Sequence, residues 1–424
     1  MKKSALLPVL MVIASLGSLS CSSYSKKAGT APTSGLPERV FASQSASTPT
    51  ASSGLIIING TNDTIGRGGI SAGSSPGLMA ISPERATLLA FDSLTNRVDV
   101  VNTVNETLTG TISLPGSTTS IIAPQAQVGY AAVPDAEING NPAGGLVEMN
   151  LSSGGITTTI SVPKAQTVVS NSDGSQLLVF SNDSDSVTVV YPALVNSGSP
   201  VTVTVPGFDR PVAAVFSGGT AYVLNCGAQC QGTQASVQIL NLGNTPPTAG
   251  AAVPVDGATI GFLSGTTLYV AGTSPSNNAC TGQTTAATAC GRLNIVDLGS
   301  MTVTGSAVIT NGYHDRIDMS VNGQLFIGSL GCDEVGNVNS PQGEVRGCLT
   351  IYNTTNGNVV IPPDNGDVTG LQSFTSRDVE YVAEGGRLRV YDTLTNTLLL
   401  NDFISNGTII ITGVITDVKA VDFF

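Results

Sequence analysis

A four-stranded pattern repeats along this chain from about residue 39 to its end. The clearest copy spans residues 177–220, LLVFSNDSDSVTVVYPALVNSGSPVTVTVPGFDRPVAAVFSGGT. Two alternating strands joined by a polar turn are followed by a Thr/Val-rich strand and by an apolar strand that ends at Gly-Gly. Aligned on their first strands, the copies begin near residues 39, 88, 130, 177, 221, 268, 325 and 379. A four-stranded unit repeated at this period is typical of a propeller blade.

The repeat therefore predicts an all-β fold, a β-propeller of four-stranded blades. We count eight copies, and seven remain an alternative because the first copy (39–73) is the weakest. The apolar fourth strand is expected to be innermost in a blade. The last residues, ITGVITDVKAVDFF, match such a strand, whereas the first copy starts at an outer-type strand. The N- and C-terminal strands are therefore expected to pair and close the ring.

Several strands resemble a known family of repeats. YVLN (222–225) and YVAG (269–272), each followed by a hairpin, are similar to the YVTN-type propeller repeats of bacterial and archaeal surface proteins. SPERATLLAFDSLTNRVDVVNT (82–103) resembles the consensus of that repeat. The resemblance covers residues 39–424, a single predicted domain. It implies the fold more than the function, since such propellers include binding modules, lactonases and cofactor enzymes.

The N-terminus has the features of an export signal. Lys2 and Lys3 precede an apolar run from Ala5 to Leu16, too short for a membrane span, and small residues lead to Cys21. This arrangement resembles the lipobox of bacterial lipoproteins, although Ser18 stands where Leu is usual. It implies a signal peptide over 1–20, a lipidated Cys21 and a tether over 21–38. An ordinary cleaved signal is the alternative. Under the resemblance, Ser22 favours the outer membrane of a bacterial cell envelope.

Composition excludes one class of partner. Only 11% of residues are charged and the formal net charge is −12, with no basic cluster. Nucleic acid is therefore not an expected partner. A protein or glycan at the cell envelope is the partner we expect, and the protein itself is expected to be a monomer.

Six of the seven cysteines form three local pairs, each between the first and second strands of a copy. They are Cys226 with Cys230, Cys280 with Cys290, and Cys332 with Cys348. In an exported protein this arrangement predicts three disulfides that staple long hairpins. A zinc site or a redox-active pair is a weaker alternative.

Catalytic motifs are scarce. The chain has one histidine, His314, and no tryptophan, P-loop or HExxH segment. The Gly-rich stretch at 66–77, which includes the GxSxG pattern GISAG, lacks a strand-to-helix context and is expected to be a turn between strands. The absence of tryptophan disfavours quinone-dependent propeller dehydrogenases, which pack their cofactor on that side chain. The Asp-rich turn at 182–186 has oxygen ligands for calcium, but turn chemistry explains it equally well. No catalytic residue, metal or cofactor is predicted.

Charged doublets precede or begin several apolar strands. They are Asp209 and Arg210, then His314, Asp315 and Arg316, and finally Arg377 and Asp378. The loop that enters an innermost strand borders one mouth of the channel, so these residues are candidates for a ligand site for an anion or a sugar. Ion pairs between blades are the alternative. The function we predict is an envelope-anchored binding module, and the alternative is a lactonase-like hydrolase using His314 and Asp315.

Overall fold

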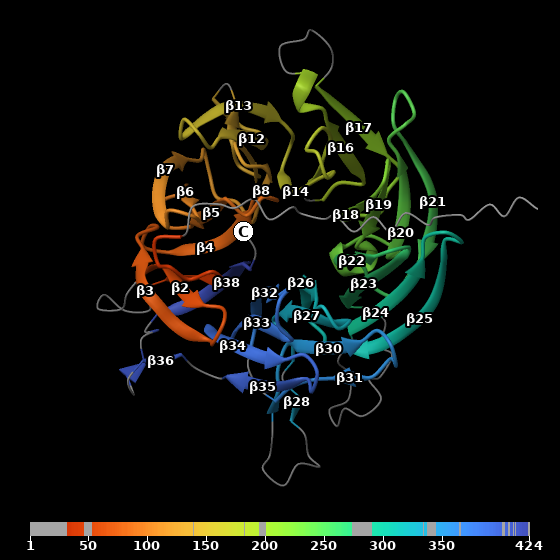
Figure 1. Ribbon diagram of the computed structural model, residues 1–424. Helices are drawn as coiled ribbons and strands as arrows, with labels where there is room; N and C mark the ends of the chain where they lie inside the picture. The colour runs from red at the N-terminus through yellow and green to blue at the C-terminus, as the bar shows by residue number, and fades with distance from the viewer. Residues whose placement is uncertain are drawn as a thin grey trace, which may run out of the picture.

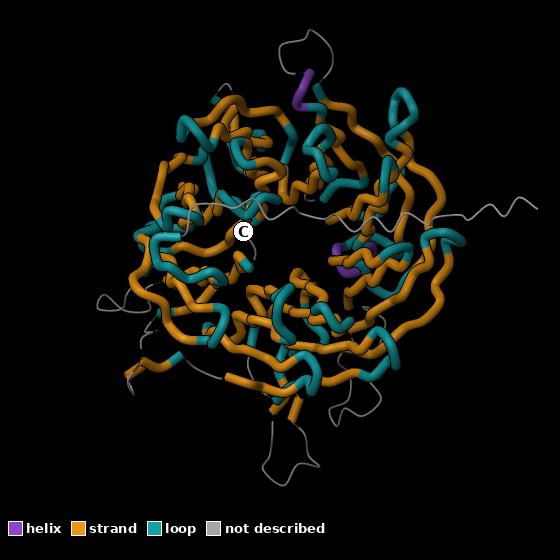
Figure 2. Tube along the Cα trace, in the orientation of Figure 1, coloured by secondary structure: helices purple, strands orange, loops and turns teal. Residues whose placement is uncertain are grey.

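The structure is a computed structural model. It describes residues 32–45, 53–138, 140–181, 183–194, 201–273, 291–333, 335–336, 345–363, 366–400, 403–405, 408–409, 411 and 413–422. Within these ranges the helical segments are two short 3-10 turns, Pro192–Leu194 and Gly227–Cys230, and the rest is strand and loop (Figure 2). No helix in the described part of the chain is long and apolar enough to cross a membrane.

Eight four-stranded antiparallel sheets stand around a common centre, which confirms the eight-bladed propeller (Figure 1). From the centre outward, blade 1 holds β38 (Val414–Val421), β1 (Arg39–Ser45), β2 (Gly54–Asn59) and β3 (Thr64–Ile70). Blade 2 holds β4 (Pro76–Ile81), β5 (Thr87–Asp92), β6 (Arg97–Asn102) and β7 (Thr107–Ser113). Blade 3 holds β8 (Ser120–Gln125), β9 (Val128–Val133), β12 (Gly145–Asn150) and β13 (Gly155–Ser161). Blade 4 holds β14 (Ala165–Ser170), β15 (Leu177–Ser181), β16 (Ser186–Val190) and β17 (Thr202–Pro206).

The second half of the chain continues in the same order. Blade 5 holds β18 (Pro211–Ser217), β19 (Thr220–Asn225), β20 (Ser236–Asn241) and β21 (Thr248–Pro254). Blade 6 holds β22 (Ile260–Ser264), β23 (Thr267–Thr273), β24 (Gly291–Asp297) and β25 (Thr302–Ile309). Blade 7 holds β26 (Tyr313–Met319), β27 (Gln324–Leu330), β30 (Leu349–Asn353) and β31 (Val359–Val360). Blade 8 holds β32 (Val368–Ser373), β33 (Val379–Glu384), β34 (Arg387–Asp392) and β35 (Thr397–Leu400).

Three two-stranded hairpins extend from this ring. They are β10 (Glu137–Ile138) with β11 (Asn141–Pro142), β28 (Val335–Gly336) with β29 (Val345–Arg346), and β36 (Ile404–Ser405) with β37 (Thr408–Ile409).

Strand pairing between the two ends of the chain closes the ring, as the sequence predicts. The C-terminal strand β38 is antiparallel to β1, with Arg39 opposite Val421 and Ser45 opposite Val414. The innermost strand of blade 1 thus comes from the C-terminus and its other three strands come from the N-terminus. The apolar fourth strand of each predicted repeat is innermost, but it begins the next blade.

The hairpins are closed by side chains that the repeat supplies. The segments DSLTN (92–96) and DTLTN (392–396) place an aspartate at a strand end. Asp92 Oδ1 accepts the N–H of Leu94 at 2.9 Å, and Asp392 Oδ1 accepts that of Leu394 at 2.8 Å. Asn96 and Asn396 then adopt positive φ angles of 51° and 57°. Aspartate and asparagine favour such turns because their short side chains bond to the following backbone.

The hydrophobic core consists of eight clusters, each between two neighbouring blades. Val40, Ile415 and Val418 of blade 1, for example, pack with Tyr381 and Val390 of blade 8. Because no blade buries both of its faces alone, closure of the ring completes the core.

Alternating chain direction gives the ring two distinct faces. The chain enters each innermost strand on one face, here called the mouth face, which also carries the loops between the second and third strands of a blade. The remaining loops lie on the opposite rear face. The described cysteines, Cys226, Cys230, Cys332 and Cys348, are on the mouth face.

The chain joins the ring from the rear face. Ser34 donates from its backbone N–H and its hydroxyl to Glu106, at 2.7 and 2.6 Å. Glu106 also pairs with the fully buried Arg39 at 2.9 Å, and Leu36 packs against the core between blades 1 and 2. Residues 32–36 of the predicted tether therefore lie against the hairpin between β6 and β7, while Cys21 lies outside the described residues.

Candidate functional site

The mouth of the central channel forms a cavity on the mouth face. A cavity of about 600 Å³ opens there and is lined by residues of six blades. Its polar lining includes Thr119, Ser120, Gln166, Thr167, Ser181, Asp183, Ser184, Arg210, Gln231, Tyr313, Asp315 and Arg316. Leu78, Ile121, Phe180, Val212 and Ile260 are among its apolar lining residues. Mixed polar and apolar linings of this size are typical of small-molecule sites.

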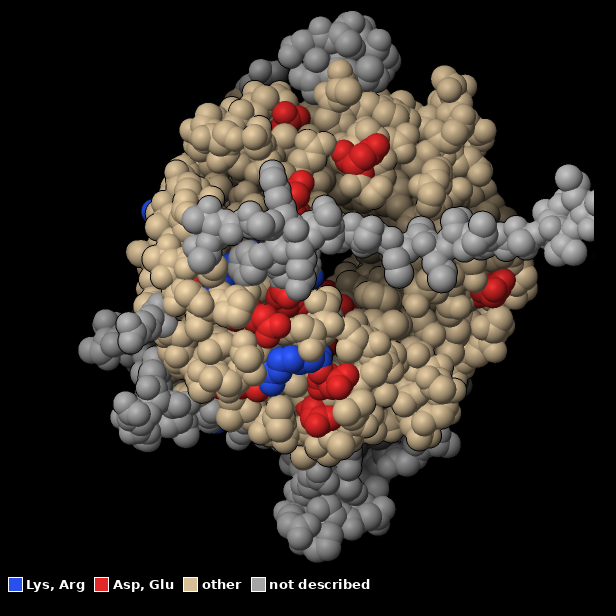
Figure 3. Space-filling view, viewed as in Figure 1, with Lys and Arg blue, Asp and Glu red and all other residues tan. Residues whose placement is uncertain are grey.

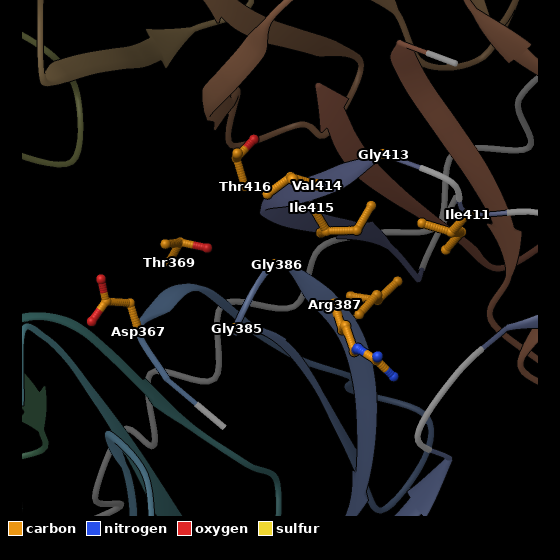
Figure 4. A pocket seen from close by; sticks show the side chains of 11 residues that line it. Asp367, Thr369, Gly385, Gly386, Arg387, Ile411, Gly413, Val414, Ile415 and Thr416 are labelled. Carbon is orange, nitrogen blue, oxygen red and sulfur yellow. The ribbon is translucent and has the colours of Figure 1, made fainter. Parts of the chain in front are cut away.

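A second cavity, also of about 600 Å³, lies beside the first between blades 8 and 1 (Figure 4). Asp367 and Arg387 lie toward opposite sides of it, and Val414 and Ile415 of β38 lie across from the turn at Gly385 and Gly386. A hydrogen bond from Arg316 Nε to the Thr369 carbonyl, 2.6 Å long, links the two cavities.

Beta-bulges aim side chains into these cavities. In six of the innermost strands the pairing register shifts at the mouth end, which leaves one or two residues out of the ladder. The residues at these positions include Leu78, Gln166, Val212, Asp315, Thr369 and Thr416, and all six line one of the two cavities. Bulges commonly redirect a side chain next to a functional site. Asp315 is a candidate from the sequence, whereas the other five are not. The sequence signal that could have found them is the position they share, at the start of an innermost strand.

Asp315 is the charged member of this set. Its Oδ2 accepts a hydrogen bond from Arg316 Nη1 at 3.0 Å, whereas its buried Oδ1 has no hydrogen-bond partner among the described residues. Burial raises the pKa of Asp315 to about 6; Arg316 opposes this shift, and Asp417 and Asp367 add to it. A carboxyl group with this pKa is half ionised near pH 6, closer to neutrality than an ordinary aspartate, and perturbed pKa values of this kind are common at functional sites.

His314 does not face the cavity. Its side chain is fully buried, and Nε2 lies 2.9 Å from the Thr310 carbonyl oxygen. Burial lowers the pKa of His314 to about 4, with the Thr310 contact opposing the shift, so the imidazole is neutral at pH 7. A hydrolase at the mouth would depend on Asp315 rather than on a His314–Asp315 pair.

Asp209 and Arg210 have different roles in the turn that enters β18. The Asp209 carboxylate accepts the backbone N–H groups of Thr233 at 3.0 Å and Gln234 at 2.7 Å, which ties the turn to the disulfide loop of blade 5. Partial burial opposes ionisation, but these hydrogen bonds lower the pKa of Asp209 overall. Arg210 lines the cavity and has a φ of 54°, a conformation rare for a long side chain.

Arg377 and Asp378 lie on the rear face, away from the other candidates. They belong to the turn between β32 and β33, where Asp378 is exposed. Arg377 binds both carboxylate oxygens of Asp63 in blade 1, at 2.7 and 2.8 Å, and Tyr381 also donates to Asp63. This pair ties blade 8 to blade 1. The structure brings Arg210, Asp315 and Arg316 together at the mouth and does not bring Arg377 and Asp378 there.

Charged groups are scarce on the face shown in Figure 3, and most of those in view lie between the centre and the sector of the blue strands of Figure 1.

Among the described residues no group of three or more His, Cys, Asp or Glu side chains is placed to hold a metal ion.

Two of the three predicted disulfides are confirmed. Cys226–Cys230 and Cys332–Cys348 are bonded, and both close loops between the second and third strands of a blade. Cys280 and Cys290 lie outside the described residues. Because such bonds persist in oxidising compartments, the two disulfides indicate an extracytoplasmic location.

Comparisons with known proteins support the fold. No family model matches the chain, and no curated protein matches its sequence. Among solved structures it is similar to the dihydro-heme d1 dehydrogenase NirN in complex with DHE, with 12% identity and a TM-score of 0.58 over 92% of this chain and 78% of that one. The periplasmic gluconolactonase PpgL of Pseudomonas aeruginosa is 13% identical over 91% of this chain and 99% of that one, with a TM-score of 0.47. At these identities the similarity to NirN shows the propeller fold alone.

Proposed function

We propose that this protein is a binding module of the cell envelope, anchored through Cys21, that takes its ligand at the mouth of the channel. The observation that carries the proposal is the convergence of six bulged side chains on two adjoining cavities. A channel that served only as a scaffold would gain nothing from bulges that interrupt its innermost ladders, because each bulge leaves backbone groups unpaired.

The entry of the chain supports an orientation. Ser34, Glu106 and Arg39 hold the N-terminal segment on the rear face, so an anchor upstream of it pulls on that face. The mouth face, with its disulfide-closed loops, would then point away from the membrane. This arrangement leaves the cavities accessible to a ligand while the protein stays anchored.

The test is a comparison of ligand retention between the full-length protein and a variant with a blocked mouth. Val212→Trp places a large side chain in the cavity, and Leu394→Trp is the matched control because Leu394 is exposed on the rear face. Envelope extracts and defined libraries of glycans and peptides are applied to each protein. The proposal expects retention by the wild type and by Leu394→Trp, and loss in Val212→Trp. Equal retention by all three would overturn it.

One observation favours hydrolysis at the same mouth, as in the lactonase-like alternative. Asp315, with a pKa of about 6, is suited to act as a general acid or base near neutrality. A panel of lactones assayed with wild type and with Asp315→Asn tests this alternative. Turnover that depends on Asp315 would support a hydrolase, and binding without turnover would support the module.

A further inference from the structure

Tyr313 presents an exposed aromatic ring at the rim of the mouth. The residue is 42% exposed, and among the described residues it is the one aromatic residue in the set of exposed large apolar groups. It begins β26 and lines the same cavity as Asp315, two residues further on. An exposed ring beside a polar cavity gives a ligand a flat apolar surface with polar groups within reach.

The turn that carries Tyr313 is held from both sides by the two disulfide loops. Gln229, inside the Cys226–Cys230 loop, donates to the Gly312 carbonyl at 3.2 Å and accepts the N–H of Thr273 at 2.8 Å. On the other side Asn311 exchanges two hydrogen bonds of 2.8 Å with Asp333, the residue after Cys332. The backbone that carries the ring is therefore held before any ligand arrives, which lowers the entropy cost of ordering this turn on binding.

Polar groups with unused hydrogen-bonding capacity lie in the same cavity. Within the described part of the chain, Asp315 Oδ1 has no partner that donates to it, and Arg210 Nε has no hydrogen-bond acceptor, with Asp185 Oδ1 3.8 Å away. Both atoms are buried and both residues line the cavity. Buried polar atoms usually find a partner. Because these two expose almost no surface, a ligand would bond to them only after a small movement of the side chains that cover them.

The charge of the mouth is balanced, although the chain carries a net charge of −12. The charged residues that line the two cavities are three aspartates and three arginines: Asp183, Asp315, Asp367, Arg210, Arg316 and Arg387. An anionic ligand would meet Asp315 and a cationic one would meet Arg210 and Arg316. A neutral ligand that both donates and accepts hydrogen bonds avoids either repulsion.

From these four features we infer that the ligand is a neutral carbohydrate, one of whose rings packs on Tyr313. This inference rests on the proposed binding function and names its ligand class. A pyranose ring has an apolar C–H face for the tyrosine ring and hydroxyl groups around its edge. Those hydroxyls would bond to the polar side chains that line the cavity, among them Asp315, Arg210, Ser120, Gln166 and Thr167.

The test measures binding of defined oligosaccharides to the full-length protein by calorimetry. The probes are neutral gluco-, galacto-, manno- and N-acetylglucosamine oligomers, uronic acid and glucosamine oligomers as charged counterparts, and a set of short peptides. Neutral oligomers should bind. Tyr313→Ala should weaken that binding at least about tenfold, whereas Tyr313→Phe, which keeps the ring, should stay within about threefold. Leu394→Ala on the rear face is the control and should change nothing.

The outcomes separate this inference from the proposed function. Preference for charged oligomers or peptides, with loss in Val212→Trp, would overturn the carbohydrate assignment and leave the binding mouth intact. Neutral sugars bound equally by wild type and Val212→Trp would overturn both. An unchanged affinity in Tyr313→Ala, or binding to no member of the panel, would overturn the role given to Tyr313 and its ligand. Thermal unfolding of each variant confirms that a loss of binding is not a loss of folding.

Discussion

Asp417 on the last strand accepts a hydrogen bond from the backbone N–H of Met79, 338 residues earlier in the chain, at 2.7 Å. Its other oxygen accepts the N–H of Val418 at 2.8 Å and pairs with Lys419 at 3.0 Å. The innermost strands of blades 1 and 2 are thus joined by a buried carboxylate. Asp318 repeats the arrangement between blades 7 and 8, where it accepts the N–H of Ser373 at 2.7 Å. Edge N–H groups of innermost strands, which no neighbouring strand pairs, are satisfied in this way.

Asp417→Ala should destabilise the whole propeller. The substitution leaves the N–H of Met79 without its acceptor and Lys419 without its partner, so the free energy of unfolding should fall by about 2–4 kcal/mol. Chemical denaturation followed by circular dichroism measures the change. Asp297→Ala, in an exposed turn with a similar set of local hydrogen bonds, is the control and should have a much smaller effect. Equal effects of the two substitutions would contradict a role for Asp417 in joining the blades.

Deletion of residues 412–424 should prevent the ring from closing. It removes β38, whose Ile415, Val418 and Val421 are buried at up to about 2 kcal/mol each, and it exposes the edge of β1. The truncated protein should be insoluble or rapidly proteolysed, which fractionation and limited trypsin digestion detect. Val414 is 40% exposed and contributes less than its place in the sequence pattern suggests.

The matched N-terminal deletions refine the limits of the tether. Removal of residues 22–31 should leave stability unchanged. Removal of 22–38 should lower it, because Ser34 and Leu36 contact the ring. If both N-terminal deletions behave alike, these contacts do not stabilise the fold.

His314 and Asp315 should give opposite pH dependences of stability. The folded-state pKa of Asp315 is raised to about 6, so its contribution to stability falls as pH rises from about 4 to 6. The folded-state pKa of His314 is lowered to about 4, so its contribution falls as pH drops from about 6.5 to 4. Each pKa shift corresponds to at most about 3 kcal/mol of unfolding free energy. In the wild type the two pH dependences nearly cancel because they have opposite signs.

Single substitutions should reveal each slope. Relative to wild type at the same pH, Asp315→Asn should be stabilised above pH 6 and lose that advantage at pH 4. His314→Gln should be relatively more stable at pH 4 than at pH 7. Urea denaturation between pH 4 and 7.5 measures both. If the difference in unfolding free energy between each variant and the wild type stays constant across this range, neither group has the shifted pKa given above.

The fold could be predicted from the sequence because each copy repeats the same local chemistry. Alternating apolar strands and polar turns recur about once per blade, so a propeller of eight blades, with seven as the alternative, and its closure by the C-terminal strand could be predicted from the pattern. The mouth could not be predicted to the same degree. Bulges depend on pairing register between strands, which no single strand encodes, so Gln166 and Thr369 carry no mark of their position in the sequence.

The candidate doublets show the same limit. Asp315 and Arg377 occur in similar charged runs, but one run begins an innermost strand and the other follows one. The first therefore reaches the mouth face and the second reaches the rear face. Adjacent residues also separate, since His314 points into the core while Asp315, displaced by a bulge, lines the cavity.

Mass mapping of the unreduced protein should find three linked pairs. Cys226–Cys230 and Cys332–Cys348 are expected from the structure and Cys280–Cys290 from its place in the equivalent loop of blade 6. Replacing Cys332 and Cys348 with serine should cost about 3 kcal/mol in the chain-entropy model. It should also weaken ligand binding, because Asp333 would hold the Tyr313 turn less firmly. A free thiol at Cys280, or any pairing between loops, would contradict the assignment of one disulfide to each hairpin.

Cys21→Ser should release the protein from the membrane fraction in soluble, folded form. The expectation follows from the apolar run before Cys21 and from contacts of residues 33–36 that hold the chain to the rear face. Fractionation with high-salt washing distinguishes a lipid anchor from surface adsorption. In the anchored wild type, an affinity tag in the mouth-face turn at 93–96 should be accessible to antibody, whereas one in the rear-face turn at 171–176 should be less so. Continued salt-resistant membrane association of Cys21→Ser would remove the anchor from the proposed function. Equal accessibility of the two tags would instead leave the anchor in place and show that the mouth has no fixed orientation.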